Sequence, residues 1–161
     1  MNDEKTIRLD RMRYTKNTFS SNFALLAILF DVFFFISLYE SDVGTYYYNI
    51  LIGASILYNL VFMLAAFLSS EGIKNYKAGY AFLMLLLAAG QIGRIFVYPV
   101  RAHAAVVTVQ DQAVAVMGDG QFIRMTAYLI LSAVCLLIGA IAGLSRSWML
   151  RRHLASLGVS A

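Results

Sequence analysis

Residues 22–39 read NFALLAILFDVFFFISLY, an apolar run that is broken once, near its middle, by Asp31. A helix needs about 20 mainly apolar residues to cross the hydrocarbon core of a bilayer, and this run has that length. A carboxylate at the centre of a membrane costs roughly 2.5 to 3.5 kcal/mol, so we expect Asp31 to face protein or water and to have a partner there. The stretch therefore predicts a membrane-spanning helix with one polar, inward-facing position.

The composition of the whole chain agrees with this first run. Of its 161 residues, 60% are hydrophobic and 14% are charged, and the mean hydropathy is +0.70, whereas about a quarter of the residues of a soluble domain are charged. We predict an all-α integral membrane protein, a four-transmembrane-helix bundle that forms a single membrane domain over residues 1–161. The predicted parts are a basic tail (1–20), helices at about 21–40, 47–69, 78–98 and 122–145, an outer loop (99–121) and a second tail (146–161).

Lysine and arginine are distributed unevenly between the two sides of this bundle. One side has the five basic residues of positions 1–20, Lys74, Lys77 and three arginines after the fourth run, while the other has Arg101 and Arg124. The positive-inside rule therefore predicts that both termini are cytoplasmic, and we expect a multi-pass protein of the bacterial plasma (inner) membrane. Nucleic acid is not an expected partner, because the basic residues flank apolar runs. Residues 1–20 are either a solvated tail, a short interfacial helix or a segment that recognises anionic lipid.

Local signals predict where elements begin and end. Ser20, Ser21 and Asn22 are candidate N-caps of the first helix, and Asp119 is a candidate cap of the fourth. Pro99 should end the third helix. The valine-rich outer loop is compatible with a β-hairpin over 107–116 or with an amphipathic helical turn, and its periodicity does not distinguish them.

Small and polar residues mark the faces on which membrane helices pack, because lipid is as apolar as leucine. Such residues recur at helical spacing in every run. They are Ala24, Ala27 and Asp31; Ser55, Asn59 and Ala66; Gly90, Gln91 and Arg94; and Arg124, Tyr128, Ser132, Cys135, Gly139, Ala142 and Gly143. Gly139 and Gly143 form a GxxxG element, which packs either within this chain or against a neighbour.

Four of these residues form a candidate polar cluster within the membrane: Asp31, Asn59, Gln91 and Arg94. Arg94 either forms an ion pair with Asp31 or extends to the outer headgroups. A protonated Asp31 would alternatively donate a hydrogen bond to the Asn59 carbonyl. Asp31 is thus either a binding site for a proton or cation or a structural buried polar group.

The sequence has no paired-carboxylate, HExxH, GxSxG or phosphate-loop pattern, no metal-ligand spacing and no cofactor motif. Cys135 is the only cysteine, which excludes an intrachain disulfide. We therefore predict a non-catalytic accessory or structural subunit of a larger membrane complex for transport or for the cell envelope. Its expected partners are membrane lipid and other membrane subunits or itself.

Two other functions are compatible with the sequence. One is a homo-oligomeric small transporter or channel that uses Asp31 and the neighbouring polar residues. The other is a lipid-acting enzyme with its site in the outer loop, at His103, Asp111 or Asp119.

Overall fold

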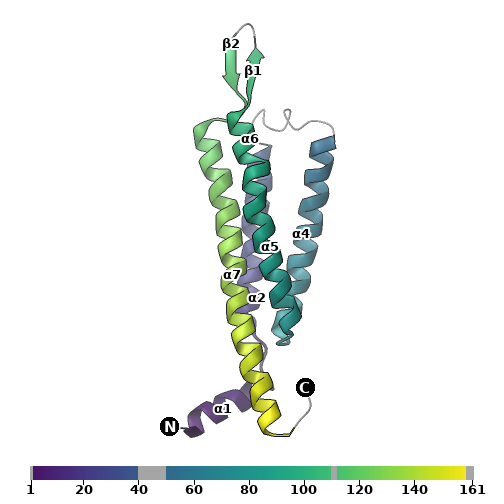
Figure 1. Ribbon diagram of the computed structural model, residues 1–161, viewed down its shortest axis with the longest axis vertical. Helices are drawn as coiled ribbons and strands as arrows, with labels where there is room; N and C mark the ends of the chain where they lie inside the picture. Colours follow the sequence, from purple (N-terminus) through teal and green to yellow (C-terminus); the bar gives the residue numbers. More distant parts are fainter. Residues whose placement is uncertain (1, 40–49, 110–111, 159–161) are drawn as a thin grey trace.

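The computed structural model describes residues 2–39, 50–109 and 112–158. Four long helices alternate in direction along the chain and form one bundle (Figure 1). The described elements are α1 (Asn2–Met12), α2 (Thr18–Leu38), α4 (Ile50–Lys74), α5 (Ala78–Val97), α6 (Pro99–Ala104), β1 (Val106–Val109), β2 (Gln112–Ala115) and α7 (Asp119–Ser156). Four segments are long and apolar enough to span a membrane, as predicted, and they lie in α2, in α4, in α5 together with α6, and in α7.

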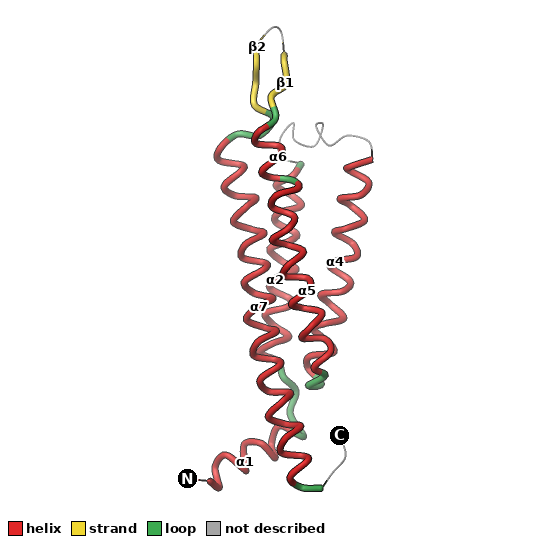
Figure 2. The backbone as a smooth tube through the Cα atoms, viewed as in Figure 1, coloured by secondary structure: helices red, strands yellow, loops and turns green. Residues whose placement is uncertain are grey.

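The two ends of the bundle differ (Figure 2). At the hairpin end, β1 and β2 pair antiparallel, with Val106 opposite Ala115 and Val109 opposite Gln112. The hairpin alternative for this loop is therefore confirmed, and the amphipathic helix is wrong. At the other end, which we call the termini end, α1 and the end of α7 lie together with both chain termini (Figure 1).

Several predicted helix ends are wrong for local reasons. Asn17, and not Ser20, Ser21 or Asn22, is the N-cap of α2, and its side chain accepts from the backbone N–H of Ser20. Gly118, rather than Asp119, is the N-cap of α7.

The predicted C-terminal tail also proves to be largely helical. Helix α7 continues to Ser156, well beyond the predicted end near 145, because no glycine or proline interrupts residues 144–156. Gly158, with a φ of 70°, adopts the left-handed conformation that ends helices. By contrast, Pro99 follows the third helix as predicted, and it occupies the first turn of α6.

The core consists of two apolar clusters stacked along the bundle axis. The cluster nearer the termini end contains Ala24, Ala27, Phe62, Ala66, Ile73, Ala81, Met84, Ala88, Cys135, Leu136 and Ala140. The cluster nearer the hairpin end contains Phe34, Leu38, Tyr98, Ala102, Val116, Met117, Met125 and Leu129. Between them, at one helical turn from each, lie the polar residues Asp31, Gln91 and Ser132.

The GxxxG glycines of α7 pack inside this chain. A Cβ on Gly139 would meet the Met84 side chain at 2.6 Å and the Ser20 carbonyl oxygen at 3.0 Å. A Cβ on Gly143 would meet Ile73 at 2.5 Å. These contacts decide between the two open interpretations of the motif, since α2, α4 and α5 approach it closely.

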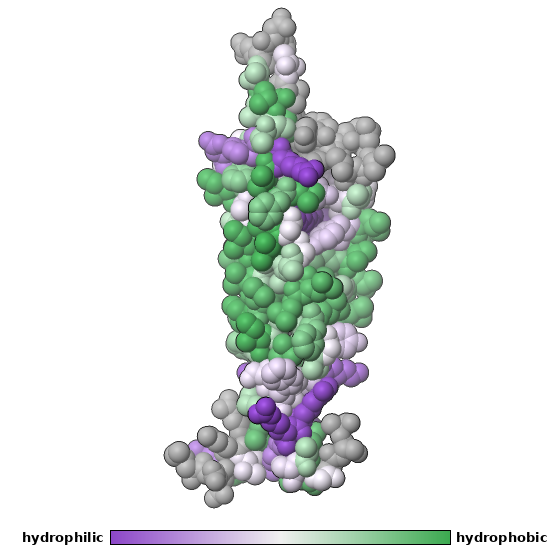
Figure 3. Space-filling model, in the orientation of Figure 1, coloured by the Kyte–Doolittle hydropathy of each residue, from purple (hydrophilic) through white to green (hydrophobic). Residues whose placement is uncertain are grey.

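The surface of the bundle is apolar over most of its length and polar at both ends (Figure 3). Exposed apolar residues occur on every long helix, for example Leu29 on α2, Leu64 on α4, Leu86 on α5 and Ile141 on α7. Helix α4 leans away from α5 toward the hairpin end (Figures 1 and 2). It is the long helix that packs least tightly against the others.

Candidate functional site

A buried polar layer links three of the four long helices, and its members are Asp31 on α2, Gln91 and Arg94 on α5, and Ser132 on α7. Their side chains reach one another because each lies on the inward face of its helix, three or four residues from a buried apolar neighbour. The exposed fraction is 1% for Asp31, 0% for Gln91 and 4% for Arg94.

One carboxylate oxygen organises the layer. Oδ1 of Asp31 accepts a hydrogen bond from Nη1 of Arg94 at 2.8 Å and another from Nε2 of Gln91 at 2.9 Å. Nε2 of Gln91 also lies 3.3 Å from the Ser132 hydroxyl, which itself donates to the Ala27 carbonyl at 2.9 Å. Opposite charges and hydrogen bonds thus tie α2, α5 and α7 together, which offsets part of the desolvation cost of the two ions.

The Arg94 guanidinium is also surrounded by aromatic rings. Its central carbon lies 4.2 Å from the ring centroid of Phe34, 4.8 Å from that of Tyr58 and 5.6 Å from that of Tyr98. Such cation–π contacts stabilise a desolvated cation by roughly 0.5 to 2 kcal/mol each. Of the two alternatives for Arg94, the structure shows the ion pair with Asp31, because pairing and ring contacts hold the side chain inside the bundle.

Asn59 on α4, the fourth residue of the predicted polar cluster, lines a cavity next to the polar layer. This α2–α4 cavity has a volume of about 160 Å³ and is lined by Asp31, Val32, Phe35, Ile56, Asn59, Leu60 and Met63. Both amide atoms of Asn59 are buried without a hydrogen-bond partner in the described part of the chain. The alternative pairing of Asp31 with Asn59 is thus absent from the structure.

Several other buried polar atoms in and near the layer also lack a hydrogen-bond partner. Besides the two amide atoms of Asn59, the unpartnered atoms among the described residues include Oδ2 of Asp31, Oγ of Ser55, Oε1 of Gln91, and Nε and Nη2 of Arg94. Most buried polar groups in proteins are hydrogen-bonded, and each exception requires a physical explanation. Asp31 lines the same cavity as Asn59, Ser55 precedes Asn59 by one helical turn on α4, and the Arg94 guanidinium contacts the Tyr58 ring of α4, so several of these residues lie near the α2–α4 cavity.

The outer-loop residues form a separate group at the hairpin end. The His103 ring stacks on Phe122 with centroids 4.6 Å apart, and its Nδ1 lies 3.3 Å from the Met117 carbonyl oxygen. Its Nε2 lies 3.8 Å from an oxygen of Asp119, which is 92% exposed. Asp111 lies outside the described residues. Over the ranges that the structure describes, no three His, Cys, Asp or Glu side chains are grouped to hold a metal ion.

Sequence reasoning identified the charged members of the polar layer but missed the three rings around Arg94. Tyr98 follows Arg94 by four residues, which is a local signal for a contact on one helix face. Phe34 and Tyr58 lie on other helices, and their approach depends on the packing of the bundle.

Comparisons of this chain with protein-family models, with curated proteins and with solved structures gave no match.

Proposed function

We propose that this chain is a non-catalytic, multi-pass membrane protein that acts as an accessory or structural subunit of a larger membrane complex. The observation that carries the proposal is the α2–α4 cavity, where the buried side-chain amide of Asn59 lacks a hydrogen-bond partner among the described residues and lies beside exposed apolar side chains. We infer that a transmembrane helix of a partner protein covers this cavity. It would contribute an amide or hydroxyl side chain at the level of Asn59.

The surroundings of the cavity support a helical partner. Ile56 and Leu60, which line it, are 39% and 57% exposed, so its rim has the apolar character of a helix-packing surface in lipid. A cavity of about 150 Å³ admits a benzene-sized group, and this one therefore has room for one polar side chain. Hydrogen bonds between membrane helices contribute on average about 0.6 kcal/mol each. A polar side chain of the partner at this level would therefore add to the affinity of the complex and make the surface specific for a helix that carries such a side chain.

The proposed location is the bacterial plasma membrane, with both termini in the cytoplasm. Basic residues that line or flank the termini end support this orientation: Arg11, Arg13, Lys16, Lys74, Lys77, Arg146, Arg151 and Arg152. Arg101 and Arg124 are at the hairpin end. The asymmetry follows the positive-inside rule.

The first test is gentle extraction from the native membrane, followed by native mass spectrometry with identification of every chain that co-purifies. We expect a second protein at a fixed ratio. A photo-crosslinking residue at Leu60 should then capture that protein, while the same residue at Ile141, on the exposed face of α7, should not. The chain alone, with no second protein captured from position 60, would refute the subunit proposal.

A single substitution separates partner binding from folding. Asn59→Leu removes two unpartnered buried polar atoms, so it should stabilise the isolated chain, and it should also weaken the complex because the partner loses its hydrogen-bonding group. Leu57→Ala, at an exposed position outside the cavity lining, is the control and should leave the complex intact. Unchanged association of Asn59→Leu would contradict the assigned surface.

The unpartnered atoms also favour the second candidate, a homo-oligomeric transporter or channel in which Asp31 and its polar neighbours bind a transported ion or proton. The two functions differ in water access to this region. A cysteine at position 59, in a background lacking Cys135, should react with a water-soluble maleimide in a transporter and remain unmodified in the subunit that we propose. Reaction together with a homo-oligomeric mass would reverse our preference.

A further inference from the structure

Three segments that are distant in the sequence meet at the termini end of the bundle. They are the α1–α2 linker, the turn between α4 and α5, and the C-terminal third of α7. The backbone N–H of Asn17 donates to the Lys74 carbonyl at 2.9 Å, and its side-chain oxygen accepts from Arg146 at 2.6 Å. The linker is therefore held between the other two segments.

Helix α1 is held in place by a contact near its C-terminal end. Nε2 of His153 on α7 lies 2.8 Å from Oδ1 of Asp10 on α1, and this contact is half-buried. Figure 1 shows α1 running sideways from the bundle axis at this level. The contact fixes the C-terminal end of α1 against α7.

Two adjoining cavities lie where these segments meet, with volumes of about 310 and 260 Å³. They share Met12, Thr15, Lys16 and Tyr76. The basic residues that line one or the other are Arg11, Arg13, Lys16, Lys74 and Arg146, and no carboxylate is among the lining residues. Both cavities are therefore strongly positive.

Most of this charge is not neutralised by neighbouring side chains. Lys74 pairs with Glu71, and Asp10 is engaged by His153. In the described ranges, Arg11, Arg13 and Lys16 lie within ion-pair distance of no carboxylate. Arginine and lysine residues that line the same cavity, together with Tyr76, provide donors that fit an oxyanion such as phosphate.

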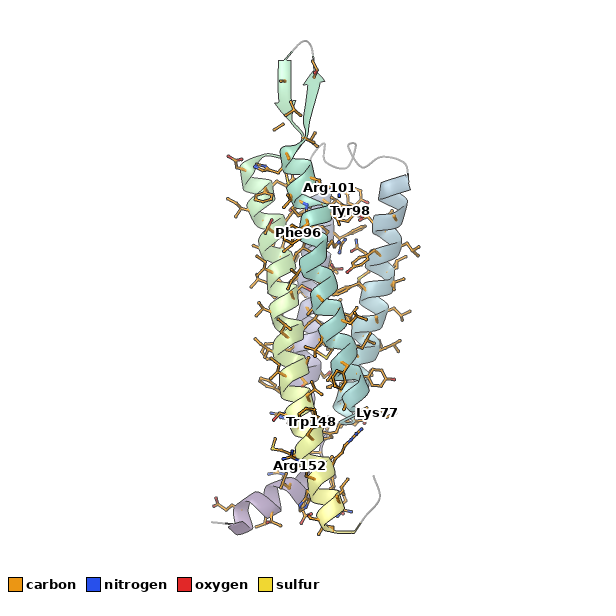
Figure 4. The ribbon with its side chains drawn as sticks, viewed as in Figure 1. Lys77, Phe96, Tyr98, Arg101, Trp148 and Arg152 are labelled. Atoms are coloured by element: carbon orange, nitrogen blue, oxygen red, sulfur yellow. The ribbon has the colours of Figure 1, made fainter. Side chains whose placement is uncertain are left out.

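The level of the cavities indicates where that phosphate comes from. They lie at the termini end, where the apolar surface of the bundle is followed by a polar surface (Figure 3). Trp148 lies close to the level of Lys77 in Figure 4, is 54% exposed, and has the amphipathic ring typical of the membrane–water interface. Tyr14, which lines the larger cavity, is 85% exposed. We propose that these cavities bind the phosphate of an anionic phospholipid headgroup.

The test uses the full chain, purified in a neutral detergent, and native mass spectrometry during titration with phosphatidylglycerol. The variant is Arg11→Gln with Lys16→Gln, because both side chains are exposed and form no ion pair that the fold would lose. The matched control is Arg151→Gln with Arg152→Gln, which removes the same charge from exposed positions of α7 that line neither cavity.

We expect the first variant to bind phosphatidylglycerol about 25-fold more weakly, at roughly fivefold per charge, and the control to bind within about twofold of the wild type. Phosphatidylcholine should bind weakly to all three proteins. Equal losses in the two variants would overturn the proposal, because binding would then follow net charge alone. Displacement of the lipid by a molar excess of inorganic phosphate would refute the lipid as the source. Both variants should unfold at the same temperature as the wild type, which shows that a change in lipid binding does not come from a change in folding.

Discussion

The ion pair between Asp31 and Arg94 makes a quantitative prediction. Arg94→Met keeps most of the side-chain volume but removes the cation, and leaves the buried carboxylate of Asp31 with Gln91 as its remaining donor. Asp31→Asn removes the anion and leaves a buried guanidinium among three rings. Breaking a buried pair by removing one partner costs about 3 to 5 kcal/mol, so each variant should lose at least about 3 kcal/mol of unfolding free energy.

The double variant distinguishes a pair from two independent residues. Removing both charges leaves no uncompensated ion, and such replacements are often neutral. We expect Asp31→Asn with Arg94→Met to lose no more than either single variant, about 3 kcal/mol, which gives a coupling energy of about 3 kcal/mol. A coupling energy of about 3 kcal/mol is at the upper end of the range of coupling energies for residues in contact.

The assay is reversible unfolding in mixed micelles, with helix content followed by circular dichroism as a denaturing detergent is added. Arg101→Met makes the same chemical change at an exposed position near the hairpin end and should remain within about 0.5 kcal/mol of the wild type. A coupling energy below about 0.6 kcal/mol, the average for membrane hydrogen bonds, would refute the buried pair. Arg94 would then have to be solvated.

Two other predictions concern the termini half of the bundle. Gly139→Ala should destabilise the protein by about 1 to 3 kcal/mol, since the added methyl meets the Ser20 carbonyl oxygen, whereas Gly93→Ala, with no atom within 4 Å of the new Cβ, should be neutral or stabilising. Equal effects on the unfolding transition would contradict the close approach of α2 to α7. Asn17→Ala should cost about 1 to 2 kcal/mol because it removes the N-cap of α2 and the acceptor of Arg146. Asn22→Ala, at an exposed position inside the helix, should change the same unfolding free energy by less than about 0.5 kcal/mol, and a larger loss there than at Asn17 would show that the cap is misassigned.

Much of the helical part of the fold could be predicted because its signals are local. The length of an apolar run determines whether a helix can cross a bilayer, and spacing by three and four residues determines which side chains share its face. Asp31, Gln91 and Ser132 were recognised as inward-facing for this reason, and all three are buried. The orientation of Arg94 stayed open between the bundle interior and the headgroups, and the structure buries it. The helix ends were less predictable, because a cap is decided by backbone angles at one residue, as at Asn17.

The sequence by itself thus determined the four long helices, their apolar surfaces and the polar faces that they turn inward. The tertiary structure decided which polar residues meet: the packing of the helices brings Arg94 and Gln91 to Asp31, while Asn59 on α4 lines a cavity and has no partner among the described residues. It also brought the α1–α2 linker, the α4–α5 turn and α7 together around two basic cavities. Contacts of this kind depend on the relative positions of helices that are far apart in the sequence, and no local periodicity encodes those positions.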